Sequence, residues 1–490
     1  MIFNQFTLLL VMTLLIIIPT SCGDDAVVNT PTEPTPGPAE PTFAVDVGQS
    51  VIPYVVINSN GTQILNEPKV AADLKIYVQE QEVQTATIGI EYRGSTSYRI
   101  SDKKSFGIET WDAFGNDIDA SFFGFPEEED WVVQGHVVNI DDNYIFDRTL
   151  IYHVYGYELS RMIGRYASRT QLVELELNGV YQGVYGFMEK LKRDNDRIDI
   201  KRLEPGDVDS TSITGGYIIK IDKTAGGNEN IGRPLSYFDS NWDDDARYTE
   251  ENSFRSQYDI NGDVLNFEPY RPPYHSEQYL ETYFLYEYPK QSEITDGQKM
   301  YIQNYMDEFE TALLNDDFDS GERTYTDYID LGSFADYFIL NELVRNVDAY
   351  RLSTYMSKDR SGKLEMGPIW DLNIGYDSGD RIPFDGWVID YNQYVERDAW
   401  MLPFWWTRLM EDSLFREEVK SRWFSYRSSV FSNESLLGLV DELVNYLKTN
   451  GAVERNYNRW GTVDYDASIN AMKSYLEFRL TWMDGEIQAF

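Results

Sequence analysis

Two aspartates occupy positions from which they could act on one reacting group. Asp348 lies 12 residues before Arg360, and Asp371 lies 11 residues after it. Arg360 belongs to the turn sequence Asp-Arg-Ser-Gly at 359–362, which separates two segments with strand-like composition. Antiparallel pairing brings together residues at similar distances from a turn, so we expect both carboxylates at the open end of one hairpin. Such a pair suits either metal-assisted group transfer or general base catalysis.

Structural roles for the two aspartates are compatible with the same spacing. Asp348 follows a segment with helical periodicity, and it could cap the end of that helix or a turn. Asp371 could pair with an arginine. The residues alone therefore leave a catalytic pair and two structural carboxylates as alternatives.

An α+β fold is expected to position this hairpin. Alternating or continuous apolar segments and an Asn-Gly turn predict strands at 52–58, 72–78, 87–92, 104–110, 172–177, 184–188 and 217–221. Helical periodicity predicts helices at 143–162, 297–314, 331–347, 413–430, 434–447 and 467–482. Residues 223–275 lack either periodicity and predict a long insertion. A strand-rich portion packed on a helix-rich portion leaves a cleft between them, where a site is expected.

The charge of the chain limits its partners. The sequence has 490 residues, 82 of them acidic and 42 basic, and its formal net charge is −40. A field this negative repels a polyanion, so we expect no nucleic acid partner. A small basic pocket for one nucleotide stays compatible with this charge, because the sign inside a pocket can differ from the net charge.

Cysteine and histidine usage argues against several kinds of site. Cys22 is the single cysteine, which excludes an intramolecular disulfide and a cysteine-based metal site. The three histidines, His136, His153 and His275, have no paired spacing, so a zinc site is not expected.

The N-terminal segment is typical of an exported lipoprotein. Residues 6–19 form an apolar run of the length of a signal-peptide core, too short to span a bilayer comfortably. Thr20 and Ser21 then precede Cys22, which resembles a bacterial lipobox, and Gly-Asp-Asp at 23–25 is similar to the export tag of Bacteroidetes surface lipoproteins. A plain secretory signal with an incidental cysteine is the alternative.

These features predict a lipoprotein signal peptide at 1–22 with lipidation of Cys22, followed by a Pro/Thr-rich tether at 23–42. We expect a secreted protein that is lipid-anchored to the outer membrane or cell surface and that contacts the membrane through this anchor only.

A series of motifs resembles the spore coat protein H (CotH) kinase family over roughly residues 50–460. The motifs are Arg93-Gly94-Ser95-Thr96-Ser97, Asp147-Arg148-Thr149-Leu150, Leu177-Asn178-Gly179-Val180-Tyr181-Gln182-Gly183, Gly215-Gly216-Tyr217-Ile218, Asn346-Val347-Asp348 and Pro368-Ile369-Trp370-Asp371. The resemblance implies an atypical protein-kinase-like fold with two lobes, a β-rich N-terminal lobe at 43–225 and a helical C-terminal lobe at 226–490.

The resemblance also implies an activity. Family members transfer the γ-phosphoryl group of ATP to Ser or Thr of protein substrates, so the expected partners are a nucleotide and a secreted or surface protein. Asp348 would be the base or the residue that orients the hydroxyl, and Asp371 would hold Mg²⁺, with Mn²⁺ as a possible substitute.

Three further residues are expected at the nucleotide. The turn that begins at Arg93, followed by Lys104 on a strand, resembles a phosphate-covering loop and its nucleotide lysine. Glu189 could orient that lysine. The sequence does not decide between Lys103 and Lys104, and a surface hairpin with solvated lysines is the alternative.

Two departures from the family pattern concern the metal. Ser353 stands where many members have Asn, and Asn373 stands where many have a second Asp. Both positions would contribute metal ligands, but a hydroxyl is a weak ligand for a hard cation and an amide carries no charge. The changes are compatible with a slow kinase, a one-metal kinase or a pseudokinase. The alternative function is therefore a non-catalytic surface binding protein, such as an adhesin or a glycan-associated module.

Overall fold

Seven strands of the N-terminal half close into a barrel. The computed structural model describes residues 43–209, 211–224, 242–378 and 381–490, which belong to one compact unit, Phe43–Phe490. In spatial order the barrel strands are β1 (Tyr54–Asn58), β2 (Val70–Val78), β3 (Gln81–Arg93), β4 (Ser105–Trp111), β5 (Asp130–Gly135), β9 (Val180–Glu189) and β8 (Thr170–Leu177). Neighbours pair antiparallel except β1 and β8, whose parallel pairing closes the barrel.

Alternating burial explains why these strands form a barrel. On β2 the residues Ala72, Leu74 and Ile76 are buried, while the residues between them are exposed. This period of two sends one apolar face inward, where it meets Val173 and Phe187 of the neighbouring strands. The strands predicted from the sequence are confirmed, although β3 begins several residues before the predicted position.

A second sheet lies in the C-terminal half. Its order is β11 (Ser253–Arg255), β12 (Tyr283–Tyr288), β10 (Tyr217–Ile221), β13 (Thr354–Lys358) and β14 (Leu364–Met366). The last two strands are the predicted hairpin, with Met356 opposite Met366. β10 pairs with β12 and β13, so this strand belongs to the second sheet although the sequence placed it in the N-terminal lobe.

Helices dominate the rest of the described chain. They are α1 (Thr96–Ile100), α2 (Tyr152–Met162), α4 (Asp296–Leu314), α5 (Leu331–Val344), α6 (Tyr391–Tyr394), α7 (Trp405–Glu411), α8 (Ser413–Arg427), α9 (Asn433–Thr449), α10 (Ala452–Trp460) and α11 (Tyr465–Gln488). Short strands β6 (Val138–Asn139) and β7 (Tyr144–Ile145) form a separate pair. The described fold is therefore α+β, as predicted.

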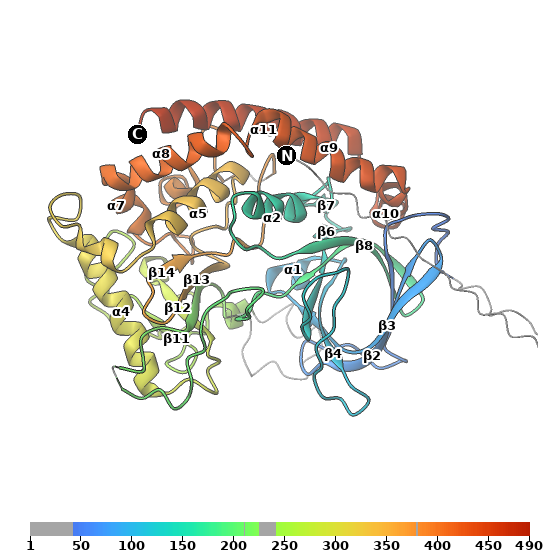
Figure 1. Ribbon diagram of the computed structural model, residues 1–490, viewed down its shortest axis with the longest axis horizontal. Helices are drawn as coiled ribbons and strands as arrows, with labels where there is room; N and C mark the ends of the chain where they lie inside the picture. The colour runs from blue at the N-terminus through green and yellow to red at the C-terminus, as the bar shows by residue number, and fades with distance from the viewer. Residues whose placement is uncertain (1–42, 210, 225–241, 379–380) are drawn as a thin grey trace, which may run out of the picture. The chain divides into compact units, whose positions relative to one another are not determined.

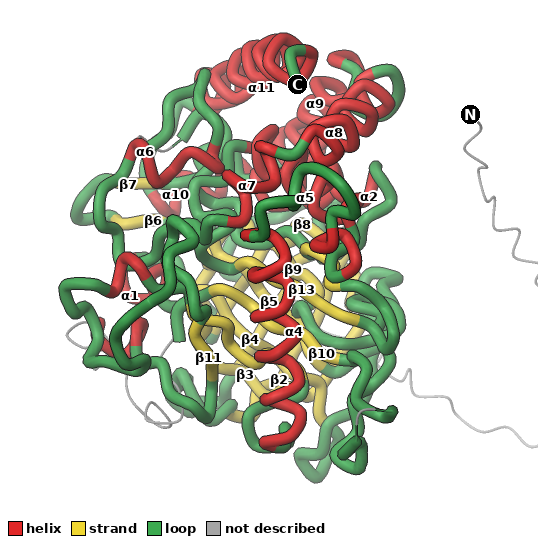
Figure 2. Tube along the Cα trace, turned by 90° about the vertical axis from the view of Figure 1, so that its left-hand side faces the viewer, coloured by secondary structure: helices red, strands yellow, loops and turns green. Residues whose placement is uncertain are grey.

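The helices form layers around α5. Every residue from Gly332 to Val344 is buried, and most of them are apolar, as expected for a central helix. Helices α8, α9 and α11 form an outer layer along one side of the unit (Figure 1). Helix α4 lies over one face of the second sheet (Figure 2), with Tyr301 against Tyr217 of β10 at a ring distance of 6.4 Å. Among the described residues no helix is both long and apolar enough to cross a bilayer.

Helix α10, which the sequence analysis did not predict, joins the C-terminal half to the barrel. Asn456 Oδ1 accepts hydrogen bonds from Val184 N at 3.0 Å and from Lys103 Nζ at 2.9 Å. Gly183 has a φ of +93°, and a Cβ at this position would lie 2.4 Å from Asn456 Oδ1. The close approach of α10 to β9 thus requires glycine here.

The helix predicted at 143–162 is wrong in its first half. Residues 144–145 form β7, and α2 begins only at Tyr152. The Asp147 carboxylate accepts hydrogen bonds from the backbone amides of Thr149, Leu150 and Tyr152, and Leu150 takes a left-handed φ of +66°. A side chain that captures these amides replaces the helical hydrogen bonds of this turn.

The predictions for 1–42, namely the signal peptide, the lipidated Cys22 and the tether, lie outside the described residues.

Candidate active site

The open end of the β13–β14 hairpin faces a cavity of about 510 Å³. The residues that line it come from the hairpin, from the β3–α1 loop and from the end of β10. Five of the residues singled out in the sequence are among them: Arg93, Asp348, Ser353, Asp371 and Asn373. The expected convergence of the two aspartates on one space is therefore present, and its volume suits a small-molecule ligand.

Asp348 is held by arginines. Helix α5 ends at Arg345, which takes a left-handed φ of +48°, and the chain then turns into the cavity. Arg351 Nη2 donates to Asp348 Oδ1 at 2.5 Å, and Arg381 Nη1 lies 3.8 Å from the same oxygen. The Arg351 side chain is 1% exposed, and its Nη1 also donates to the Trp400 carbonyl. Its guanidinium is thus fixed from two sides and fixes one oxygen of Asp348.

Asp371 has a different environment. Its side chain is 38% exposed, and Nε2 of His153 lies 3.9 Å from Asp371 Oδ1. Among the described residues no lysine or arginine forms an ion pair with this carboxylate. Asp371 also takes a left-handed φ of +58°, a sparsely populated conformation that clusters at functional sites. A cavity-facing carboxylate without a cation partner has the character of a metal ligand.

A second oxygen near Asp371 lacks a hydrogen bond. Asn373 is 8% exposed, and its Oδ1 has no hydrogen-bond partner among the described residues. Buried polar atoms are nearly always satisfied, so this oxygen points to a group that the chain itself does not supply. Carboxylate and amide oxygens are ligands that Mg²⁺ accepts, and Asp371 with Asn373 therefore fits a divalent cation.

Ser353 lies on the same cavity wall, opposite the end of β10. It takes a left-handed φ of +46°, and its backbone amide interacts with the Asp222 carboxylate. Burial raises the pKa of Asp222, and the proximity of Asp371 adds to this effect. Asp222 was not among the residues chosen from the sequence, and it adds a carboxylate to a site in which Asn373 replaces one.

One of the lysines that line the cavity is Lys220 of β10. Its Nζ lies 3.2 Å from Glu287 Oε2 on β12 and 3.5 Å from Asp222 Oδ2. Burial alone would lower the pKa of Lys220, but Glu287 and the other neighbours outweigh burial and raise it, so the ammonium stays charged. A sequence signal existed: Lys220 interrupts the otherwise apolar segment Tyr-Ile-Ile-Lys-Ile at 217–221.

Lys223 and Arg93 supply further positive charge. Lys223 Nζ donates to Thr96 Oγ1 at 2.6 Å and so joins the end of β10 to the loop after Arg93. The Arg93 guanidinium lies 5.7 Å from the ring centroid of Trp370, the residue before Asp371. Several basic side chains thus line the cavity, and they do so together with the acidic residues Glu67, Glu91, Asp222 and Asp398.

The structure does not bring the expected Lys104 and Glu189 together at this cavity. Neither residue lines the cavity. Lys104 Nζ donates to the Tyr98 carbonyl at 2.6 Å, whereas the fully buried Glu189 carboxylate accepts from Arg169 Nη1 at 2.6 Å and from the Tyr166 hydroxyl. The reason is that both side chains are bound within their own regions of the barrel. The buried Lys–Glu pair beside the cavity is instead formed by the second sheet.

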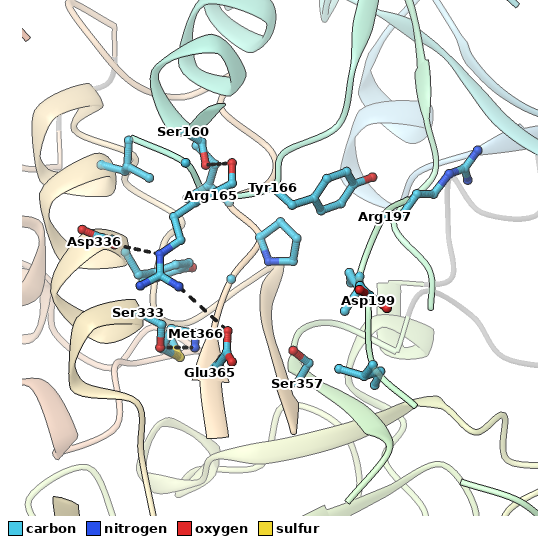
Figure 3. A pocket seen from close by; sticks show the side chains of 18 residues that line it. Ser160, Arg165, Tyr166, Arg197, Asp199, Ser333, Asp336, Ser357, Glu365 and Met366 are labelled. Atoms are coloured by element: carbon cyan, nitrogen blue, oxygen red, sulfur yellow. Dashed lines mark hydrogen bonds and ion pairs between the residues drawn. The ribbon is translucent and has the colours of Figure 1, made fainter. Parts of the chain in front are cut away.

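Another cavity, of about 270 Å³, lies beside the C-terminal end of α2. Figure 3 shows Arg165 reaching across it towards Asp336 and Glu365, at nitrogen–oxygen distances of 2.7 and 3.9 Å. Tyr337 and Ile369 contribute apolar walls. None of the catalytic, nucleotide-binding or metal-binding residues predicted from the sequence lines this cavity, although Arg165 and Arg197 both do. The cavity of about 510 Å³ is therefore the candidate active site.

Comparison with known protein families identifies the family of the chain. Residues 90–483 match the family described as CotH kinase protein. The chain belongs to the CotH kinase family. The match includes Arg93, Lys220, Asp348 and Asp371, and the β-rich N-terminal region followed by a helical C-terminal region fits the two-lobed kinase-like fold. No match to the chain is found among curated proteins.

Proposed function

We propose that this member of the CotH kinase family is an atypical protein kinase that transfers the γ-phosphoryl group of ATP to Ser or Thr of a protein. The observation that carries the proposal is that Asp348 and Asp371 face one cavity together with Lys220. Phosphoryl transfer needs an acceptor oriented beside the nucleotide, a divalent cation and positive charge around the phosphates. The cavity offers side chains for each of these requirements.

Asp371 and Asn373 are the residues that would hold Mg²⁺ or Mn²⁺. The cation would neutralise charge on the phosphates. Asp371 contributes the negative charge and Asn373 contributes a buried oxygen that has no hydrogen-bond partner among the described residues. Ser353 lies on the same wall and could contribute its hydroxyl.

Positive side chains would bind the phosphates of ATP. Lys220 is held in place by Glu287, and Lys223 is held by Thr96. Arg93 and Arg381 line the same cavity from the β3–α1 loop and from the segment after Asp371. Charge-assisted hydrogen bonds from such groups to phosphate oxygens are strong and directional.

Asp348 would orient the hydroxyl of the substrate and accept its proton. Arg351 occupies Oδ1, so Oδ2 is the oxygen that remains for a hydroxyl. A carboxylate fixed by a buried guanidinium loses little freedom when the substrate binds, and such positioning is a large part of catalysis.

The decisive experiment is transfer from labelled ATP by the purified protein. Phosphate should appear on the protein itself or on a generic protein acceptor, and only when Mg²⁺ or Mn²⁺ is added. Metal-dependent ATP binding without transfer would favour a pseudokinase. Absence of both binding and transfer would overturn the proposal and favour the surface binding protein.

We also propose that the kinase acts outside the cytoplasm, tethered by a lipidated Cys22, on secreted or surface proteins. The apolar run at 6–19 and the sequence Thr-Ser-Cys at 20–22 support this location. Mass spectrometry of the mature N-terminus tests it, because the first residue should be a lipid-modified Cys22. Cys22→Ala should release the protein from the membrane fraction or block its processing.

A further inference from the structure

Helix α2 lies directly behind the metal-binding aspartate. His153 on this helix is 6% exposed, and its Nε2 lies 3.9 Å from Asp371 Oδ1. Neither ring nitrogen of His153 has a hydrogen-bond partner among the described residues. A buried imidazole with two unsatisfied nitrogens costs free energy, so its retention beside Asp371 calls for a role.

The next turn of α2 reaches the same aspartate. Tyr157 follows His153 by four residues and therefore lies on the same face of the helix. The Tyr157 hydroxyl interacts with the backbone amide of Asp371. Its ring also stacks on Trp370 with a centroid distance of 5.9 Å and an interplanar angle of 26°. One residue of α2 thus contacts the Asp371 backbone, and another faces its side chain.

Helix α2 and the Asp371 loop are closely packed at Gly156. A Cβ at Gly156 would lie 2.2 Å from Leu372 Cδ1 and 3.0 Å from the Tyr376 hydroxyl. That hydroxyl donates to the Tyr152 carbonyl at 2.9 Å. Gly156 permits this approach, and α2 therefore acts as a rigid support for the residues around Asp371.

We infer that His153 is a positioning residue that orients the Asp371 carboxylate for the divalent cation. The inference rests on the proposed function, because it assigns a partner to its metal ligand. A separation of 3.9 Å exceeds a hydrogen bond, and contacts of this kind are often long without ligand and shorten in the working complex. Substitution of a residue that orients a metal ligand commonly weakens metal binding about 10- to 100-fold.

Another buried histidine provides a matched control. His136 is 4% exposed, and both of its ring nitrogens also lack a hydrogen-bond partner among the described residues. Its closest carboxylate is Asp147, at 3.5 Å, instead of Asp371. A substitution at His136 therefore removes a comparable buried imidazole without removing the contact to the metal ligand.

The test measures Mn²⁺ binding to the purified protein by calorimetry. His153→Leu should weaken Mn²⁺ binding about 10- to 100-fold, whereas His153→Gln, which keeps a hydrogen-bonding group, should recover most of the affinity. His136→Gln should leave Mn²⁺ affinity unchanged. Tyr157→Phe removes only a hydroxyl and should also weaken Mn²⁺ binding, which provides a second readout if His153→Leu does not fold.

The outcomes separate this inference from the proposed function. Folded His153→Leu and Tyr157→Phe proteins with wild-type Mn²⁺ affinity would overturn the inference and leave the kinase proposal intact. If His136→Gln weakens Mn²⁺ binding as much as His153→Leu does, the inference would also be overturned, because the loss would then not depend on the contact to Asp371. A wild-type protein that binds Mn²⁺ neither alone nor together with ATP would refute the metal site itself.

Discussion

The ammonium group of Lys220 lies 3.2 Å from the carboxylate of Glu287, and the two residues belong to neighbouring strands of the second sheet. Although burial would raise the pKa of Glu287, Lys220 and Lys290 lower it to about 2. Both partners therefore stay charged at neutral pH. The pair holds a lysine at the cavity without leaving an unpaired charge inside the protein.

This relationship predicts the effect of removing the Lys220 charge. Lys220→Met should weaken ATP binding by about 1.5 to 3 kcal/mol, because it removes a charge-assisted contact to phosphate. Calorimetry with ATP and Mg²⁺ measures the change. Lys104→Met is the matched control and should bind ATP normally, since Lys104 does not line the cavity. If Lys104→Met weakens ATP binding and Lys220→Met does not, the result would support Lys104, the residue expected from the sequence.

Substitutions of Asp348 and Asp371 should impair different steps, namely transfer and metal-dependent ATP binding. Asp348→Asn should bind ATP and Mg²⁺ normally but lower the rate of transfer about 10²- to 10⁴-fold, since a base acts mainly in the chemical step. Asp371→Asn should instead abolish the Mg²⁺ dependence of ATP binding. Calorimetry and a transfer assay on the same preparations separate the two effects. If both variants only shift the melting temperature, the carboxylates are structural.

Asn373→Asp should make stability depend on metal. Without metal, a second carboxylate near Asp371 adds repulsion and should lower the melting temperature. With Mg²⁺ the same carboxylate adds a ligand and should raise both the melting temperature and the rate of transfer. Asn315→Asp makes the same chemical change at the exposed end of α4 and should show no Mg²⁺ effect. If Mg²⁺ changes neither the melting temperature nor the rate of transfer of the Asn373→Asp protein, the result would argue against a metal at this position.

Glu310 predicts how stability depends on pH. It is fully buried, and burial raises its pKa from 4.5 to about 8 although Ser256 and Trp405 donate to it. The folded protein thus keeps a proton between pH 4.5 and 8 that the unfolded chain has released. The free energy of unfolding should therefore fall as pH rises through this window, by at most about 1.4 kcal/mol per pH unit.

Glu310→Gln should remove this part of the pH dependence. Urea unfolding of both proteins at several pH values measures the difference, and the wild-type curve should fall more steeply between pH 4.5 and 8. Burial also raises the pKa of Glu342, to about 7, in both proteins, so only the difference between them reports on Glu310. Parallel curves would contradict the prediction.

The sequence was informative where local patterns determine the structure. Alternation predicted the strands, and the turn at 359–362 predicted the hairpin, because both signals act over a few residues. The convergence of Asp348 and Asp371 follows from that hairpin alone. Helix α10 was missed because its short amphipathic pattern is stabilised by Gly183 and Val184 of a distant strand.

The presence of Lys220 at the cavity could not be predicted from local patterns. Lys103 and Lys104 follow the Arg93 loop in the sequence, but Lys103 is buried against Asn456 and Lys104 is bound to Tyr98. Lys220 reaches the cavity because β10 pairs with β13, a contact between residues far apart in the chain. Similarly, the first half of the helix predicted at 143–162 does not form, because the Asp147 carboxylate accepts hydrogen bonds from nearby backbone amides.

The contact between α10 and β9 has a consequence for synthesis. The ribosome completes β9 at Glu189 long before it adds Ala452, the first residue of α10. During this interval the face of the barrel that α10 later covers is exposed to other chains. We expect a chaperone to protect the nascent chain at this stage, and we expect a chain that stops before α10 to aggregate.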